Sequence, residues 1–91
     1  MKQEEALNVL RALSYGARLT LLRALLEGEK CVRELVCLTQ MRECTVSQHL
    51  ARLKYAGVVV ARREAQRIFY SLADKKIAAL LRALERIYAL E

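Results

Sequence analysis

The residues of this chain with the greatest chemical reactivity are three cysteines, Cys31, Cys37 and Cys44. Thiolates bind soft metal ions and react with oxidants, so each cysteine could serve as a ligand or as a redox group. An odd number of cysteines does not suit the disulfide framework of a secreted domain. Cys44 is the best candidate for reactivity, because a helix N-terminus favours the thiolate and Arg42 lies nearby. The alternative is that all three are small buried hydrophobic residues, as free cysteines often are.

The other residue types do not suggest catalysis. His49 is the only histidine, and the chain has no glycine-rich phosphate loop and no paired carboxylates in an apolar setting. Cys44 and His49 are five residues apart, which places them on different faces of a helix. We therefore expect no enzymatic activity, and we expect His49 to be a packed or hydrogen-bonded residue.

Residues 44–57, CTVSQHLARLKYAG, have the pattern of a DNA recognition helix. One face repeats at i, i+3, i+4 and i+7 and comprises Val46, His49, Leu50 and Leu53. The opposite, acid-free face carries Thr45, Gln48, Arg52 and Tyr55. Amide and guanidinium groups pair with base edges and phosphates, so this face is suited to DNA. Gly57 is expected to end the helix.

The charge of the chain supports a polyanionic partner. The formal net charge is +6, from 16 Lys and Arg against 10 Asp and Glu. The segment 45–72 holds five basic residues and one acid, so it supplies +4 of the +6. The basicity is therefore concentrated where DNA would be contacted.

Composition predicts one folded domain spanning residues 1–91. The chain has no proline, three glycines and 55% apolar residues, which is too apolar for disorder and too poor in loops for a β-sandwich. Charges interrupt every apolar run, so we expect no signal peptide, no transmembrane segment and a cytoplasmic location.

The elements that would position these residues are mostly helices, expected at 2–13, 17–27, 31–38, 44–57 and 74–88. The third and fourth, joined by a tight turn at 39–43, form a helix-turn-helix, with Leu35 and Leu38 as core anchors of the third helix. Asp74 is expected to cap the last helix. Val58–Val60 and the alternating run 67–72 predict two strands with a basic tip, RREAQR, between them. The expected fold is mainly α with a small β-hairpin: a winged helix-turn-helix of five helices and a two-stranded wing.

The apolar stripes of the first and last helices exceed what so small a core can bury, and they predict a homodimer. The residues expected at the dimer interface are Leu7, Leu10, Ile77, Leu80, Leu81, Leu84, Ile87 and Tyr88.

Three segments resemble the ArsR/SmtB family of dimeric winged-helix repressors: ARLTLLRALLEGEKCVREL, TVSQHLARLKYAGVV and RREAQRIFYSL. This family binds inverted-repeat operators and releases DNA when an inducer binds. The resemblance implies base contacts from Thr45, Ser47 and Gln48. It also implies that phosphates or the minor groove are held by Arg62, Arg63, Gln66 and Arg67.

Two positions depart from the family pattern. Gln40 stands where a glycine is common, so the turn must form without it. Arg42 replaces a serine, which loses a hydroxyl cap but could add a phosphate contact.

The resemblance offers several inducer designs. Metal sites on paired last helices need histidine there, and the last helix has none, so we exclude this design. Arsenite sites usually follow Cys-Val-Cys with another cysteine three residues on. Cys31 and Val32 match, but Arg33 and Val36 occupy the other two cysteine positions. A three-thiol site from Cys31, Cys37 and Cys44 would have to distort the third helix and displace the recognition helix.

The segments EKCVREL and RREAQRIFYSL look most like the thiol-switch branch of the family. In that branch one cysteine lies at the position of Cys31 and its partner near the end of the last helix, where this chain has Ala89. An internal bridge is therefore excluded, and Cys31 would react alone, with a small thiol or across subunits.

We therefore predict a homodimeric repressor of double-stranded operator DNA, with no required cofactor, whose inducer is a persulfide or an oxidant that acts on cysteine thiols. The alternative is a repressor that responds to arsenite or another thiophilic metal(loid) through Cys31, Cys37 and Cys44. A remote alternative is a basic helical protein-interaction module, which would show no preference for an inverted repeat.

Overall fold

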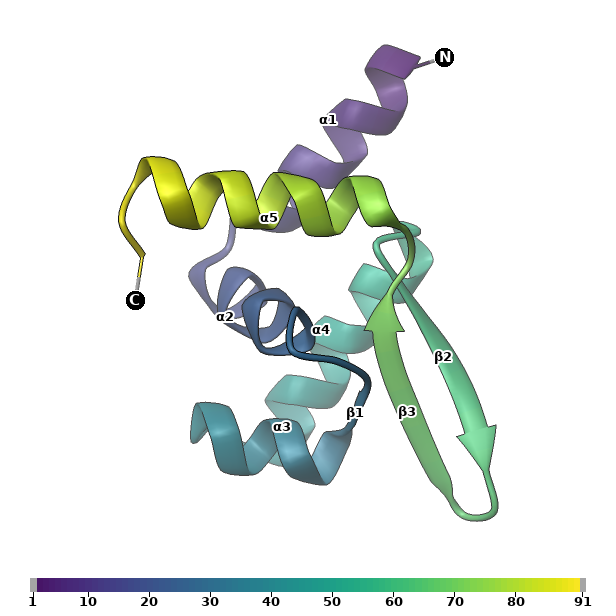
Figure 1. Ribbon diagram of the computed structural model, residues 1–91. Helices are drawn as coiled ribbons and strands as arrows, with labels where there is room; N and C mark the ends of the chain where they lie inside the picture. Colours follow the sequence, from purple (N-terminus) through teal and green to yellow (C-terminus); the bar gives the residue numbers. More distant parts are fainter. Residues whose placement is uncertain (1, 91) are drawn as a thin grey trace.

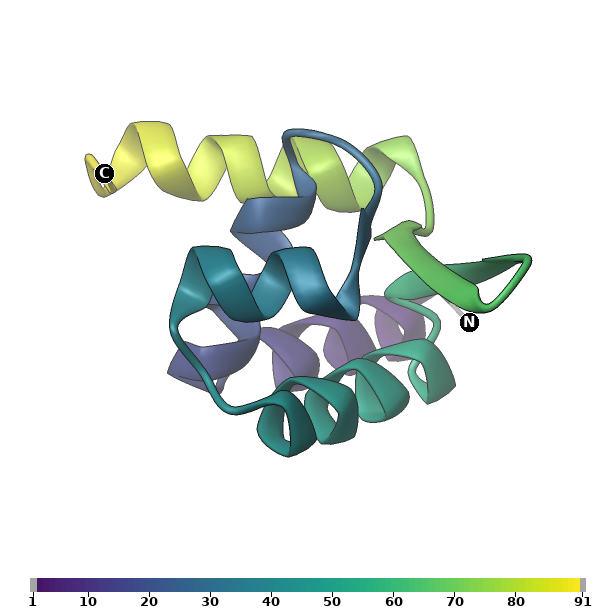
Figure 2. The ribbon, with the colours of Figure 1, turned by 90° about the horizontal axis from the view of Figure 1, so that it is seen from below.

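Five helices form the body of the molecule, and a small antiparallel sheet lies at one side of it (Figure 1). The computed structural model describes residues 2–90. The elements in chain order are α1 (Lys2–Leu13), α2 (Gly16–Leu25), β1 (Lys30–Cys31), α3 (Val32–Thr39), α4 (Glu43–Tyr55), β2 (Val59–Glu64), β3 (Arg67–Leu72) and α5 (Lys75–Ile87). The predicted winged helix-turn-helix fold is confirmed. In Figure 2, α4 and α5 lie on opposite sides of the helical body, and the β2–β3 hairpin, the wing, projects beyond it.

The core is formed by leucines and valines contributed by most elements. Its fully buried side chains are Leu21, Leu22, Leu35, Val46, Leu50, Leu53, Val58, Val59 and Leu81. Truncating one buried leucine typically costs about 2–5 kcal/mol, so these contacts fix the helices that carry the site residues.

The third helix begins one residue later than predicted, because Cys31 belongs to a short strand. Leu35 of α3 is fully buried, but Leu38 is 56% exposed, so its predicted role as a core anchor is wrong. The inward face of α3 runs through Val32, Leu35 and Val36, and Leu38 follows Val36 by two positions, about 200° around the helix.

The sheet has three strands rather than two. Strand β1 pairs with β3 on the side away from β2, with Cys31 opposite Phe69. Two residues are too few to show the alternation that marks a strand. Glu64 and Arg67 are the last pair of residues in the β2–β3 hairpin, and residues 65 and 66 form the turn between them. Both strands therefore extend into the predicted tip.

Gln40 makes the helix-turn-helix turn that a glycine would usually make. Its φ of 62° is left-handed, and its backbone N–H donates to Val36 O at 2.9 Å. The Gln40 side-chain amide also donates to Cys37 O at 2.9 Å. These bonds satisfy carbonyl groups at the end of α3, which offsets the strain of a side chain in this conformation.

The long apolar stripe of α5 is divided between two environments. Asp74 caps the helix as predicted, since its Oδ1 accepts the Ile77 N–H at 3.0 Å. Ile77 and Leu81 are buried in the core of this chain, so both are wrong as residues of a dimer interface. Leu80 and Leu84 are half-buried, whereas Ile87 and Tyr88 are exposed.

Candidate nucleic-acid interface

The fourth helix separates apolar and polar faces as the sequence predicts. Val46, Leu50 and Leu53 are completely buried, which fixes the rotation of α4 about its axis. The side chains left facing outward are Ser47, Gln48, Arg52 and Tyr55, while Thr45 is half-buried. Tyr55 is 96% exposed at the end of the helix. Packing therefore displays the residues predicted to read bases.

The start of α4 differs from the prediction. The helix begins at Glu43, one residue early, so its first turn carries an acid. Glu43 lies more than about 100° around the helix from Thr45, Gln48, Arg52 and Tyr55, so it is not on the face predicted to meet DNA. Arg42 is the N-cap residue, and its side chain makes no capping hydrogen bond. Glu43 interacts favourably with the helix dipole, and Arg42 remains exposed.

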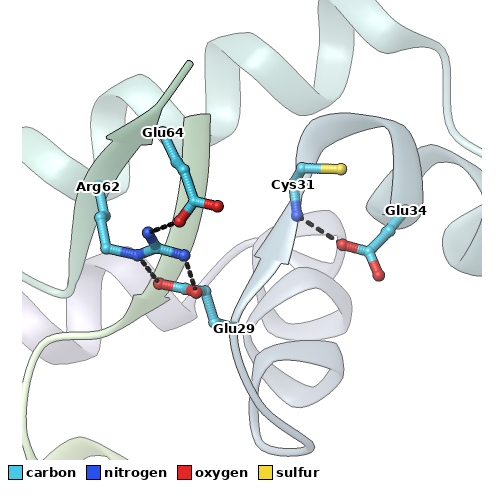
Figure 3. Close-up of polar contacts among 5 residues, drawn as sticks. All are labelled: Glu29, Cys31, Glu34, Arg62 and Glu64. Atoms are coloured by element: carbon cyan, nitrogen blue, oxygen red, sulfur yellow. Dashed lines mark hydrogen bonds and ion pairs between the residues drawn. The ribbon is translucent and has the colours of Figure 1, made fainter. Parts of the chain in front are cut away.

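Two glutamates bind the Arg62 guanidinium (Figure 3). Glu29 accepts from Nε at 2.9 Å and from a terminal nitrogen at 2.7 Å, and Glu64 accepts from the other terminal nitrogen at 2.6 Å. The guanidinium carbon also lies 4.9 Å from the centre of the Phe69 ring. The hydrogen bonds that Arg62 donates to Glu29 and then to Glu64 raise the pKa of Arg62, and Arg62 in turn lowers the pKa of Glu29. Arg62 was predicted to contact a phosphate, but its guanidinium is already bound to two carboxylates.

The other polar residues of the wing are exposed: Arg63, Gln66 and Arg67. Neither Arg63 nor Arg67 forms an ion pair within residues 2–90. The positive charge that the wing offers to an anion therefore comes from these two arginines. Sequence reasoning missed Glu29, because its partner Arg62 is 33 residues away.

His49 is a hydrogen-bonded helix residue, as predicted. Its Nδ1 accepts from Arg18 Nε at 3.3 Å, and Arg18 stacks on the Tyr15 ring with 4.3 Å between guanidinium carbon and ring centre. Burial, followed by the charges of Arg18 and Arg52, lowers the pKa of His49. A neutral imidazole is the form that accepts this hydrogen bond.

Acid should therefore destabilise the protein through His49. The folded chain holds the pKa of His49 below its ordinary value of 6.5, so the unfolded chain binds more protons as the pH falls. This stability contribution is complete above about pH 6.5 and is lost as the pH falls below it. We expect urea unfolding at about pH 5.5 and 7.5 to show a smaller pH dependence for His49→Gln than for the wild type. Parallel curves for the two proteins would contradict this role.

The three cysteines lie in two different environments, and all are free thiols. Cys31 is 7% exposed, whereas Cys37 and Cys44 are exposed. A cleft of about 560 Å³ between α3 and β3 is lined by Cys31, Val32, Arg33, Val36, Cys37, Glu43, Gln66, Arg67 and Ile68. Cys44 is outside this lining. Within residues 2–90 no three His, Cys, Asp or Glu side chains are placed to hold a metal ion, so the predicted three-thiol site is not assembled.

Cys31 also caps α3. Its backbone N–H donates to Glu34 Oε1 at 3.0 Å (Figure 3). This bond, and then a hydrogen bond with the Cys31 thiol, lowers the pKa of Glu34. Cys31 thus joins the start of α3 to the sheet that carries the wing, a position that the sequence did not reveal.

No helix within residues 2–90 is long and apolar enough to cross a membrane.

Known proteins are similar to this chain in both sequence and fold. Residues 16–60 match the family described as bacterial regulatory protein, arsR family. The biofilm growth-associated repressor of Agrobacterium fabrum is 45% identical over 80 residues, which cover 88% of this chain and 68% of that protein.

Two solved structures extend the comparison. HlyU from Vibrio cholerae superposes with a TM-score of 0.91 at 35% identity, covering 98% of this chain and 97% of that one. The homodimeric winged helix-turn-helix DNA-binding domain of a possible ArsR-family regulator from Mycobacterium bovis gives a TM-score of 0.87 at 33% identity, covering 96% and 81%. The predicted resemblance is confirmed by sequence and by structure. This chain belongs to the arsR family of bacterial regulatory proteins.

Proposed function

We propose that this transcriptional regulator is a homodimeric, sequence-specific repressor that an inducer releases from operator DNA by modifying Cys31. The observation that carries the proposal is the arrangement of two functional regions. The outward face of α4 and the wing residues Arg63 and Arg67 are exposed and could contact DNA. Cys31 lies at the edge of the same sheet that carries the wing.

The DNA contacts divide into two kinds. Thr45, Ser47 and Gln48 would meet base edges in the major groove, where a glutamine amide pairs with adenine. Contacts to phosphates, which set orientation, would come from Arg42, Arg52, Arg63, Gln66 and Arg67. Arg62 would instead stiffen the wing through Glu29 and Glu64.

A second copy of the chain would cover the exposed apolar residues of α1 and α5. Leu7 and Leu10 of α1 are exposed, and so are Ile87 and Tyr88 at the C-terminal end of α5. A cleft of about 500 Å³ between α1 and the start of α5 is lined by Val9, Leu10 and Leu80 among others. Twofold symmetry would place one α4 on each half of an inverted repeat.

The inducer that best suits the cleft at Cys31 is an inorganic polysulfide. Arg33 and Arg67 line the cleft together with one acid, Glu43, so the lining carries a net positive charge that would attract the anion. The Cys31 thiolate would attack a sulfur atom of the polysulfide. A new S–S bond forms at Cys31, one S–S bond of the polysulfide breaks, and the shorter polysulfide leaves with the electron pair.

This modification would reach the wing through the sheet. Cys31 belongs to β1, which pairs with β3 at Phe69, and its N–H donates to the Glu34 carboxylate. An additional sulfur atom with a negative charge would therefore repel Glu34 and disturb the junction of β1 and α3. Displacing β1 would move Glu29, two residues earlier, and weaken its bonds to Arg62. The wing arginines would then lose the orientation that DNA binding requires.

Binding assays with the reduced protein test the proposal. We expect tight binding to an inverted repeat from its own upstream region, with polysulfide lowering the affinity about 5- to 150-fold, a typical allosteric coupling. Cys31→Ser should bind DNA and ignore polysulfide, since serine preserves the N-cap. Cys37→Ser, which changes the exposed thiol of the same cleft, should still respond.

Other outcomes distinguish the alternatives. Release by arsenite, lost in both cysteine variants, would replace the polysulfide proposal with metalloid sensing. A response retained by Cys31→Ser would remove Cys31 from the mechanism. Equal affinity for the inverted repeat and for random duplex would contradict the repressor assignment and favour a basic interaction module.

A further inference from the structure

We propose that Arg18 of α2 binds a backbone phosphate of the operator, beside the base contacts of α4, and that Arg11 and Arg52 flank this site. The inference rests on the proposed DNA-binding function and adds a contact region outside the helix-turn-helix and the wing. The α2 helix packs against α4, and a cleft lined by Arg11, Arg18 and Tyr55 lies where the end of α1 meets α2 and α4. Residues at this junction can flank the DNA that α4 contacts.

The Arg18 side chain is held in one position by its neighbours. Its Nε donates to His49 Nδ1 at 3.3 Å, and its guanidinium stacks 4.3 Å from the centre of the Tyr15 ring. Arg18 is half-buried. A guanidinium held in this way loses little side-chain entropy when it binds an anion.

The charge at this site is not compensated by acids. Arg11 donates to the neutral Asn8 Oδ1 at 3.3 Å, and both partners of Arg18 are uncharged. Within residues 2–90, none of Arg11, Arg18 and Arg52 forms an ion pair with a carboxylate. By contrast, Arg23 and Arg62 each bind glutamate. A half-buried guanidinium with only neutral partners retains a strong affinity for an anion.

The site also has room for a phosphate. A cleft of about 260 Å³ is lined by Asn8, Arg11, Ala12, Arg18, Tyr55 and Ala56, and none of these is acidic. Within the described residues, no side-chain hydrogen bond caps the start of α2 at Tyr15, so backbone N–H groups next to Arg18 add to the positive potential. The pKa of His49 is lowered, which keeps the imidazole neutral and able to accept from Arg18.

The position of the cleft favours a DNA phosphate over a free one. His49 lies on α4 one residue after Gln48, so the Arg18 guanidinium touches the recognition helix itself. Arg52 is one turn further along α4 and is close enough to influence the His49 charge. A duplex bound at the outward face of α4 would bring its backbone to this edge.

Salt titrations of DNA binding test the inference. For Arg18→Gln we expect the slope of log K against log salt to fall by about 0.9 per subunit, the value for one lost phosphate contact. Affinity for operator and for random duplex should fall together, by about tenfold or more, because a phosphate carries no sequence information. Arg18→Lys, which keeps the charge, should restore the salt slope.

Control variants distinguish failure of the phosphate site from failure of the repressor assignment. Arg82→Gln removes an exposed charge from α5 and should leave the slope unchanged, and circular dichroism should show that all variants are folded. An unchanged slope in Arg18→Gln, or an Arg18→Lys protein that behaves like Arg18→Gln, would overturn the phosphate site while the repressor assignment stands. A wild type that does not bind DNA would overturn both. Saturable binding of inorganic phosphate that Arg18→Gln abolishes would assign the cleft to a free anion instead.

Discussion

Replacing Leu10 with glutamate will produce a folded monomer whose affinity for an inverted-repeat operator is about 10²–10⁴-fold lower than that of the wild type. Leu10 is 54% exposed on α1, so glutamate disturbs no core contact. In the proposed dimer, however, the carboxylate would be buried without a partner, which is strongly unfavourable. Without the dimer, binding to one half-site no longer raises the effective concentration at the other. Sedimentation velocity measures the assembly, and fluorescence anisotropy measures the affinity.

Leu38→Glu is the matched control for this substitution. Leu38 is 56% exposed on α3, outside the proposed interface, so this variant should remain dimeric with wild-type affinity. A duplex that carries one half-site should bind the Leu10→Glu monomer as tightly as it binds one wild-type subunit. A Leu10→Glu protein that still dimerises would show that α1 does not form the interface.

The second large effect is expected at Gln48, where alanine will remove most of the preference for the operator. A bidentate amide contact to a base is worth about 1–3 kcal/mol, or about 5- to 150-fold, in discrimination at each half-site. Gln48 is exposed between Val46 and Leu50, which are fully buried, so α4 should keep its position without the amide. Competition assays with operator and random duplex measure the change, and affinity for random duplex should stay at the wild-type value.

Arg63→Ala provides the contrast. Arg63 is exposed on the wing and has no acidic partner within residues 2–90, so it is free to neutralise a phosphate. Its loss should weaken binding to both duplexes equally and reduce the salt slope by about 0.9 for each contact. If Gln48→Ala and Arg63→Ala change specificity and salt dependence alike, the division into base-reading and phosphate-binding residues is wrong.

The structure also changes which arginines are expected to act on DNA. By sequence, Arg62 and Arg63 are adjacent and chemically equivalent, and both belong to the predicted basic tip. In the folded chain, Arg62 is bound by Glu29 and Glu64, whereas Arg63 is not bound by an acid. Strand alternation explains the difference, because neighbouring residues of β2 point to opposite faces of the wing.

The cysteines illustrate a similar limit. The sequence allowed a three-thiol site from Cys31, Cys37 and Cys44, but the cleft at α3 is lined by Cys31 and Cys37 and leaves Cys44 outside. Cys44 is near a helix N-terminus, as predicted, yet Cys31 is the residue that the sheet connects to the wing. The position of a thiol at the start of one helix therefore could not show which cysteine is connected through the sheet to the DNA-binding elements.

The sequence by itself determined the features that depend on local periodicity. The faces of α4, the two strands of the wing and the cap at Asp74 were all predicted. These features depend on residues within a few positions of one another or on apolar side chains that must leave water.

Only the tertiary structure decided which residues meet across the fold. It added β1, joined Arg62 to Glu29 and Arg18 to His49, and divided the α5 stripe between the core and the surface. The partners in the two arginine contacts are 33 and 31 residues apart. No periodic pattern encodes such pairs, because the packing of whole helices and strands determines which side chains come within hydrogen-bonding distance.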